Sequence, residues 1–86
     1  MASIAEVKAA IEAAIAQVNE GQTAVRAASE KLAEASQTMA GALEGSAHEL
    51  VSSVQAALTQ AGTELEDCLA ATLSAVEQAQ TYAAAL

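Results

Sequence analysis

Large apolar residues recur every seven positions through the first half of the chain. The unbroken run is Ile4, Ile11, Val18, Val25, Leu32 and Met39. A repeat of this kind predicts an α-helix that presents one apolar stripe to a partner helix. Three residues after the members of this run stand Val7 and then small residues, namely Ala14, Gly21, Ala28, Ala35 and Ala42. We expect these to complete the seam, with Ile15 and Leu43 beside it, so that two helix backbones approach closely.

The apolar residues of the second half follow a different spacing. Eleven residues separate the members of three sets, which are Val54, Leu65 and Val76, then Leu58 and Leu69, and then Val51 and Leu73. An eleven-residue repeat is typical of a nearly straight helix. We expect the seam of this second helix to face that of the first and to contain Val54, Leu58, Leu65, Leu69 and Val76.

Capping patterns mark where the two helices begin. Ser3 stands three residues before Glu6, and Ser46 stands three residues before Glu49. Each pair matches a capping box, in which the serine hydroxyl and the glutamate bind free backbone N–H groups of the first turn. We therefore predict a first helix over about 3–40 and a second over about 46–86.

The predicted connection between the helices is the glycine-containing segment 41–45. A short connection between two helices of equal length predicts an antiparallel hairpin. The expected fold is therefore all-α, a single alanine-rich hairpin with coiled-coil character. Gly21 and Gly62 fall inside the helices, where we interpret them as points of close backbone contact, with a hinge as the alternative.

Composition indicates that this hairpin has a thin core. Alanine contributes 25 of the 86 residues, Phe, Trp and Pro are absent, and there is one Tyr. Alanine favours helix strongly but removes little apolar surface from water. A small domain of this kind usually needs a disulfide, a metal or a partner. Because the chain has a single Cys and a single His, we expect a partner, with two hairpins forming a four-helix bundle as a homodimer or a heterodimer.

The charge disfavours several classes of partner. The formal net charge is −8, and the three cations, Lys8, Arg26 and Lys31, all lie in the first half. Nucleic acids and anionic membrane surfaces both attract basic proteins, so neither is expected as a partner. The sequence contains no uninterrupted run of about 18 apolar residues, which is the length needed to span a bilayer. The first residues lack the basic and apolar regions of a signal peptide, so we expect a cytoplasmic protein or one exported by a leaderless route.

Few residues could support catalysis, and none forms a recognisable site. His48 has no second ligand one helical turn away, so we interpret it as a surface residue rather than a metal ligand. Cys68 lies at the border of the apolar stripe, which favours a buried, unreactive thiol over a nucleophile. Glu64, Glu66 and Asp67 form an acidic cluster, which we interpret as a solvated face rather than an acid–base pair. No enzyme activity, cofactor or metal is therefore expected.

The residues at the predicted turn resemble the turn of the WXG family. This family contains small helical hairpins linked to type VII secretion in Gram-positive bacteria, with a Trp-x-Gly in the turn and a small and an apolar residue after it. Gly45, Ala47 and Leu50 match that pattern, and Leu43 stands at the tryptophan position. Tyr82 matches the tyrosine of the family's Tyr-x-x-x-Asp/Glu export signal, with Leu86 at the acidic position.

Two segments are also similar to related alanine-rich hairpins of actinobacteria, which occur alone or at the N-terminus of polymorphic toxins. They are Ala42-Leu43-Glu44-Gly45-Ser46 and Tyr82-Ala83-Ala84-Ala85-Leu86. The resemblance implies pairing with itself or with a larger toxin or secreted protein, in support of export or assembly. Two other functions stay open on the residues alone. One is a coiled-coil scaffold or filament subunit, and the other is an antitoxin-like or regulatory protein whose acidic second half binds a basic partner.

Overall fold

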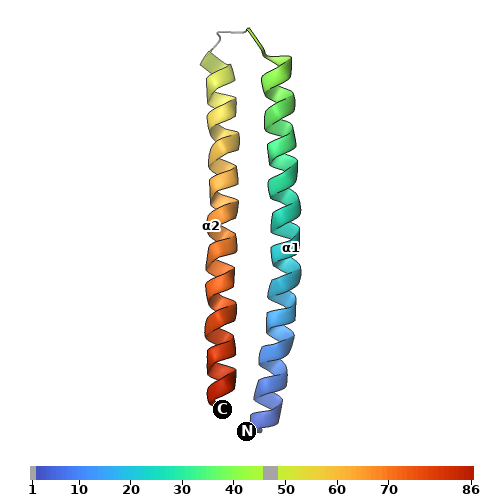
Figure 1. Ribbon diagram of the computed structural model, residues 1–86, viewed down its shortest axis with the longest axis vertical. Helices are drawn as coiled ribbons and strands as arrows, with labels where there is room; N and C mark the ends of the chain where they lie inside the picture. The colour runs from blue at the N-terminus through green and yellow to red at the C-terminus, as the bar shows by residue number, and fades with distance from the viewer. Residues whose placement is uncertain (1, 46–48) are drawn as a thin grey trace.

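The chain folds into two long helices that run side by side in opposite directions (Figure 1). The computed structural model describes residues 2–45 and 49–86. Helix α1 spans Ile4–Ala42 and helix α2 spans Glu49–Ala85. The first turn of α1 and the last turn of α2 lie at the same end of the molecule, opposite the connection. The predicted all-α hairpin is confirmed.

The hairpin is a rod and has none of the compactness of a globular domain. Its dimensions are 64 × 18 × 15 Å and its radius of gyration is 19.4 Å, whereas a compact domain of this length has a radius of gyration of about 12 Å. The long dimension follows from helices of 39 and 37 residues, which rise about 1.5 Å per residue. Neither helix, within the described ranges, has the length and hydropathy needed to cross a membrane.

The first predicted cap is present. Ser3 has an extended backbone, and its hydroxyl oxygen accepts a hydrogen bond from the backbone N–H of Glu6 at 3.1 Å. This bond satisfies one of the N–H groups that the first helical turn leaves without a partner. The second predicted cap, Ser46, lies outside the described residues, within which α2 begins at Glu49.

The connection begins two residues later than predicted, because Gly41 stays in the helix. Glycine weakens a helix but keeps its backbone hydrogen-bonding groups, so it does not force an end. Helix α1 ends at Ala42 and is capped by Leu43, whose N–H donates to the carbonyl of Met39 at 3.0 Å. Gly45 has a φ of +81° and supplies the left-handed backbone of the connection, a conformation that costs little only for glycine.

The seam of α1 consists of two columns of residues, and the second column differs from the one expected. The half-buried residues include Ile11, Val18, Val25, Leu32 and Met39, as the seven-residue run suggests. Their companions stand four residues later, not three, and are Ile15, Gln22, Ser29, Ser36 and Leu43. The small column Ala14, Gly21, Ala28, Ala35 and Ala42 is exposed. Steps of four and then three residues also keep to one face of a helix, so this alternative places polar residues in the seam.

The seam of α2 also recurs every seven residues, which corrects the eleven-residue prediction. From Leu58 onwards its half-buried positions form two columns. One is Leu58, Leu65, Thr72 and Ala79, and the other is Gly62, Leu69, Val76 and Ala83. The large apolar residues alone hide this repeat because polar and small residues occupy half of its positions. Val54, predicted in the seam, is half-buried beside Gln55, while Leu73 is 50% exposed.

No apolar side chain of the described residues is fully buried. Each helix has one neighbour, so the apolar seam residues keep a side open to solvent. Ile4, predicted to start the seam of α1, is 59% exposed, because it lies in the first helical turn where the seam begins only with Val7.

Close backbone contact was expected at the glycines inside the helices, but the structure shows none there. A Cβ atom built on Gly21 or on Gly62 would meet no neighbouring atom within 4 Å. Gly21 lies on an exposed flank of α1, and Gly62 lies in the seam of α2. Space beside Gly62 is therefore open, and it contributes to a groove described below.

Candidate interaction surfaces

Polar residues hold the centre of the seam. Gln22 is 5% exposed and is the one residue classed as buried in the described ranges. Its Nε2 donates a hydrogen bond to Oγ1 of Thr72 at 3.1 Å, and that hydroxyl donates to the carbonyl of Leu69 at 2.9 Å. This pairing meets the hydrogen-bonding needs of two side chains that the helices cover, and it sets α1 and α2 in register.

A second polar layer lies nearer to the turn. The hydroxyl of Ser36 donates to Oε1 of Gln55 at 2.9 Å, and Nε2 of Gln55 donates to the carbonyl of Ser36 at 3.3 Å. Gln22, Ser29 and Ser36 follow each other at seven-residue spacing, which is the sequence signal that could have located this column. Large hydrophobic side chains alone do not reveal this column, because its members are polar.

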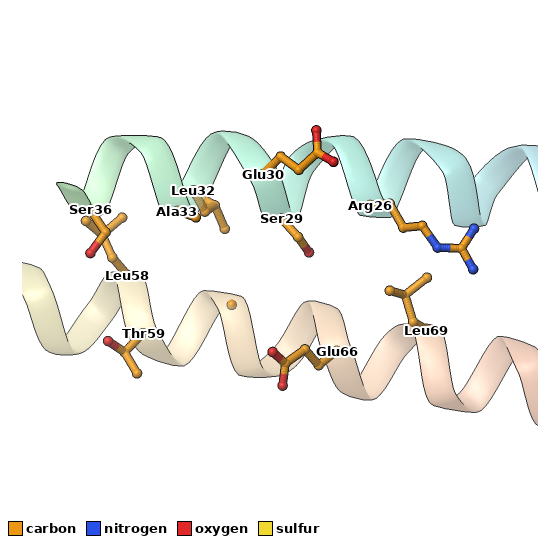
Figure 2. Close-up of a pocket in the computed structure, with 11 residues that line it drawn as sticks. Arg26, Ser29, Glu30, Leu32, Ala33, Ser36, Leu58, Thr59, Glu66 and Leu69 are labelled. Atoms are coloured by element: carbon orange, nitrogen blue, oxygen red, sulfur yellow. The ribbon is translucent and has the colours of Figure 1, made fainter. Parts of the chain in front are cut away.

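Between these layers, a groove of about 490 Å³ opens along one side of the seam. Figure 2 shows Ser29 and Leu32 projecting from α1 towards α2, and Leu58 and Leu69 projecting from α2 towards α1. Gly62 widens the groove by lacking a side chain. The hydroxyl of Ser29 is covered and has no hydrogen-bond partner, so the groove contains one unsatisfied polar oxygen beside the apolar side chains of Leu32, Leu58 and Leu69.

The groove identifies one of the two broad faces of the hairpin, which we call the groove face. Arg26, Glu30 and Ala33 of α1 line it together with Thr59 and Glu66 of α2. Residues seven positions apart share a side of each helix at this spacing, which extends the groove face along the rod. Its charged side chains are then Glu12, Arg26, Glu30, Glu49, Glu66 and Glu77.

The opposite side, which we call the alanine face, is almost free of charge. A second hollow, lined by Lys31, Glu34, Ala35, Thr38, Met39 and Ala42, marks it on α1. On α1 this face consists of Ala10, Ala14, Gln17, Gly21, Ala24, Ala28, Lys31, Ala35, Thr38 and Ala42, and on α2 of Leu50, Val54, Ala57, Ala61, Glu64, Cys68, Ala71, Ala75, Gln78 and Tyr82. Lys31 and Glu64 are its charged members, and Glu34 lies at its border, where it lines the same hollow.

The residues predicted at the turn and the C-terminal end lie at opposite ends of the rod. Leu43 caps α1, Gly45 forms the turn, and Leu50 lies in the first turn of α2 with an exposed side chain. Ala47, the remaining member of the turn motif, and the predicted surface residue His48 lie outside the described residues.

Tyr82 lies in the last part of α2, at the end where α1 begins (Figure 1), and its side chain is 58% exposed. Ile4, at the start of α1, is exposed at the same end of the hairpin. An exposed aromatic side chain is available to a partner without disturbing the seam.

Cys68 is exposed, and the expectation of a buried thiol is wrong. Cys68 lies on the alanine face, outside the seam columns of α2, so α1 does not cover it. Glu64, Glu66 and Asp67 are also exposed, and Glu64 accepts a hydrogen bond from Nε2 of Gln60 at 3.3 Å. Within residues 2–45 and 49–86, no group of His, Cys, Asp and Glu side chains is placed to hold a metal ion.

Comparison with protein-family models, with curated proteins and with solved structures finds no match to this chain.

Proposed function

We propose that the protein is a non-enzymatic interaction module whose hairpin pairs with a second helical hairpin. The second hairpin is another copy of the chain, a related hairpin, or the helical part of a larger toxin or secreted protein. Pairing supports export or assembly, as the resemblance to WXG hairpins implies. The protein acts in the cytoplasm or leaves it by a leaderless, type VII-like route.

The observation that carries this proposal is the unusually large surface of the single chain. Its accessible surface is 6181 Å², whereas a compact monomer of this mass exposes about 4,700 Å². The excess is roughly 1,500 Å², and a stable protein interface buries about 800 Å² on each partner. A partner hairpin that covers one face would therefore bring the exposed surface closer to that of an ordinary folded protein.

The energetics of the seam support the same conclusion. Ordering a backbone costs about 1–2 kcal/mol for each residue, and burial of apolar surface is the main term that offsets it. Here the seam residues are only half-buried, and several are polar or small. Two more helices packed on one face would bury side chains that now contact solvent.

Sedimentation equilibrium and thermal unfolding over a range of protein concentrations test the proposal. We expect a species larger than 8.6 kDa at micromolar concentration and a midpoint of unfolding that rises with concentration, because a partner that binds only the folded state stabilises it by mass action. A monomer that unfolds cooperatively, with the same midpoint at every concentration, would contradict self-pairing. If this monomer also fails to bind related hairpins expressed with it, the interaction function as a whole is wrong.

A second candidate, a binder of a basic partner, is favoured by the distribution of charge. Helix α2 carries Glu49, Glu64, Glu66, Asp67 and Glu77 and contains no Lys or Arg. Electrostatic binding of a cationic protein weakens steeply as salt is added. Association that is abolished by 0.5 M salt would favour this candidate, while association of hairpins through apolar surface would persist.

A further inference from the structure

The alanine face carries fewer charged residues than the groove face or the outer edges of the hairpin, and Glu34 lies at its border, where it lines the hollow beside Lys31. The groove face carries several carboxylates, and the outer edges carry Glu6, Glu20, Glu34 and Asp67. Because each copy has a net charge of −8, two copies that met through those surfaces would bring carboxylates together at a cost in repulsion and desolvation. On the alanine face, Lys31 and Glu64 balance each other.

We infer that the alanine face packs against the alanine face of a second copy of this chain, with both turns at the same end of the resulting bundle. This inference rests on the proposed function and specifies its surface and its occupant. The face runs the length of a rod 64 Å long, and it presents large side chains, such as Val54 and Tyr82, among small ones. Covering it removes surface of the order that a stable dimer requires.

The charges of the two helices select the relative orientation. If the turns lay at opposite ends, α2 would pack against α2 of the second copy, and the two strongly acidic helices would be neighbours. If the turns lie at the same end, α2 packs instead against α1 of the second copy, which carries Lys31 on the alanine face. Neighbouring helices are antiparallel in both cases, so the helix dipoles do not distinguish them.

Lys31 and Glu64 form the specific contact of this arrangement. The hydrogen bonds between Gln22 and Thr72 and between Ser36 and Gln55 set the register of the helices. On that register, Lys31 of α1 is within about one helical turn of the level of Glu64 of α2. A two-fold axis along the rod keeps this level, so each Lys31 lies near Glu64 of the second copy. In the single hairpin, Nζ of Lys31 contacts Glu34 at 3.2 Å with both side chains strongly exposed, a pairing too weak to compete.

Charge reversal tests the contact. Glu64→Lys would place a lysine near Lys31 of the second copy and should weaken dimerisation roughly tenfold, measured by sedimentation equilibrium. Lys31→Glu should weaken it as well, and the double variant K31E/E64K should restore it. The matched control is Glu66→Lys, which makes the same change in net charge on the groove face and should not weaken the dimer. Equal effects of E64K and E66K, or no restoration in the double variant, would overturn the inference.

Cross-linking tests the orientation. A chain carrying C68A and a new cysteine, Ala24→Cys, is mixed with the native chain and treated with a short bifunctional maleimide. Ala24 is close to the level of Cys68 across the proposed interface, so mixed dimers should be captured. The control is a chain with C68A and Thr23→Cys. Position 23 is at the same level along the rod but on the groove face, so this chain should give few cross-linked mixed dimers. If the reagent instead links Cys68 of one native chain to Cys68 of another in preference to forming the mixed dimer, the turns lie at opposite ends and the inference is overturned.

These outcomes separate the inference from the function on which it rests. If a dimer forms but the charge reversals do not weaken it, or the cross-linking does not depend on the position of the cysteine, the interaction function stands and the proposed interface is wrong. A chain that stays monomeric rejects the second copy as the occupant, and binding of a related hairpin then decides whether the interaction function survives.

Discussion

The side-chain amide of Gln22 donates a hydrogen bond to the hydroxyl of Thr72, 3.1 Å away on the other helix. Gln22 is the most thoroughly covered residue of the described chain, so the best-shielded point of this alanine-rich hairpin is polar. A one-step shift of either helix would separate the two groups and leave both without a partner in the seam. Buried polar pairs are known to select register in coiled coils, and we assign that role to this pair.

Removing the amide should therefore destabilise the hairpin. We expect Gln22→Ala to lower the free energy of unfolding by about 1–2 kcal/mol, because the hydrogen bond is lost and the side chain leaves a gap. Gln37→Ala, at an exposed position of the same helix, is the control and should change stability by less than about 0.5 kcal/mol. Chemical denaturation followed by circular dichroism measures both. Equal losses in the two variants would show that the Gln22–Thr72 pair has no special role.

Two serines of one seam column should respond in opposite directions. The hydroxyl of Ser29 is covered and has no partner, so Ser29→Ala should stabilise the hairpin by about 0.5–1 kcal/mol, since it removes an unsatisfied polar group. The hydroxyl of Ser36 donates to Gln55, so Ser36→Ala should destabilise it by about 1 kcal/mol. Thermal unfolding of both variants at one protein concentration gives the comparison, and a loss of stability in Ser29→Ala would contradict it.

Leu65 should contribute less than a leucine of a globular core. It is half-buried, and a fully buried leucine replaced by alanine costs about 2–5 kcal/mol. We expect Leu65→Ala to lower the free energy of unfolding by about 1–2 kcal/mol, near or below the lower end of that range. Leu73→Ala, at a residue that is 50% exposed, is the matched control and should cost less. A loss for Leu65→Ala of about 4 kcal/mol would imply deeper burial, such as a partner provides.

Two glycines should respond oppositely to alanine. Gly62 is helical, and a Cβ there would meet nothing within 4 Å, so Gly62→Ala should stabilise the hairpin by about 1 kcal/mol through helix propensity. Gly45 has a φ of +81°, so Gly45→Ala should destabilise it by about 1–2 kcal/mol through backbone strain. Unfolding midpoints of the two variants measure the contrast. A destabilised Gly62→Ala would show that the groove beside it must stay open.

Tyr82 should matter for recognition more than for folding. Because its side chain is largely exposed in the single hairpin, Tyr82→Ala should change the free energy of unfolding of the monomer, measured at high dilution, by less than about 0.5 kcal/mol. If the resemblance to WXG hairpins extends to function, the same variant should lose export or partner binding in the host, scored by the protein in the culture medium. Gln80→Ala, also exposed near the end of α2, controls for general effects. Normal export and binding of Tyr82→Ala would remove the proposed role of this residue.

The sequence was sufficient for most features that depend on neighbours along the chain, although it placed the end of the first helix two residues too early. Alanine content and the absence of proline predict long helices, the seven-residue run predicts the first apolar stripe, and Ser3 with Glu6 predicts the first cap. These features follow from backbone hydrogen bonding and helix propensity, which act over one or two turns. The turn at Gly45 belongs to the same class, because a positive φ is a local property that glycine permits.

Which residues meet across the hairpin was decided only when the two helices packed together. A repeat with large residues every seven positions leaves two choices for the second seam position, three or four residues on, and both keep to one side of a helix. The structure takes the second choice, which places Gln22, Ser29 and Ser36 inside the seam and turns Ala14, Gly21 and Ala28 outwards. Pairing of polar groups between the helices depends on both partners at once, so neither half of the chain reveals it alone. The same packing step exposes Cys68 and creates the alanine face, because a hairpin of two helices can cover only one side of each.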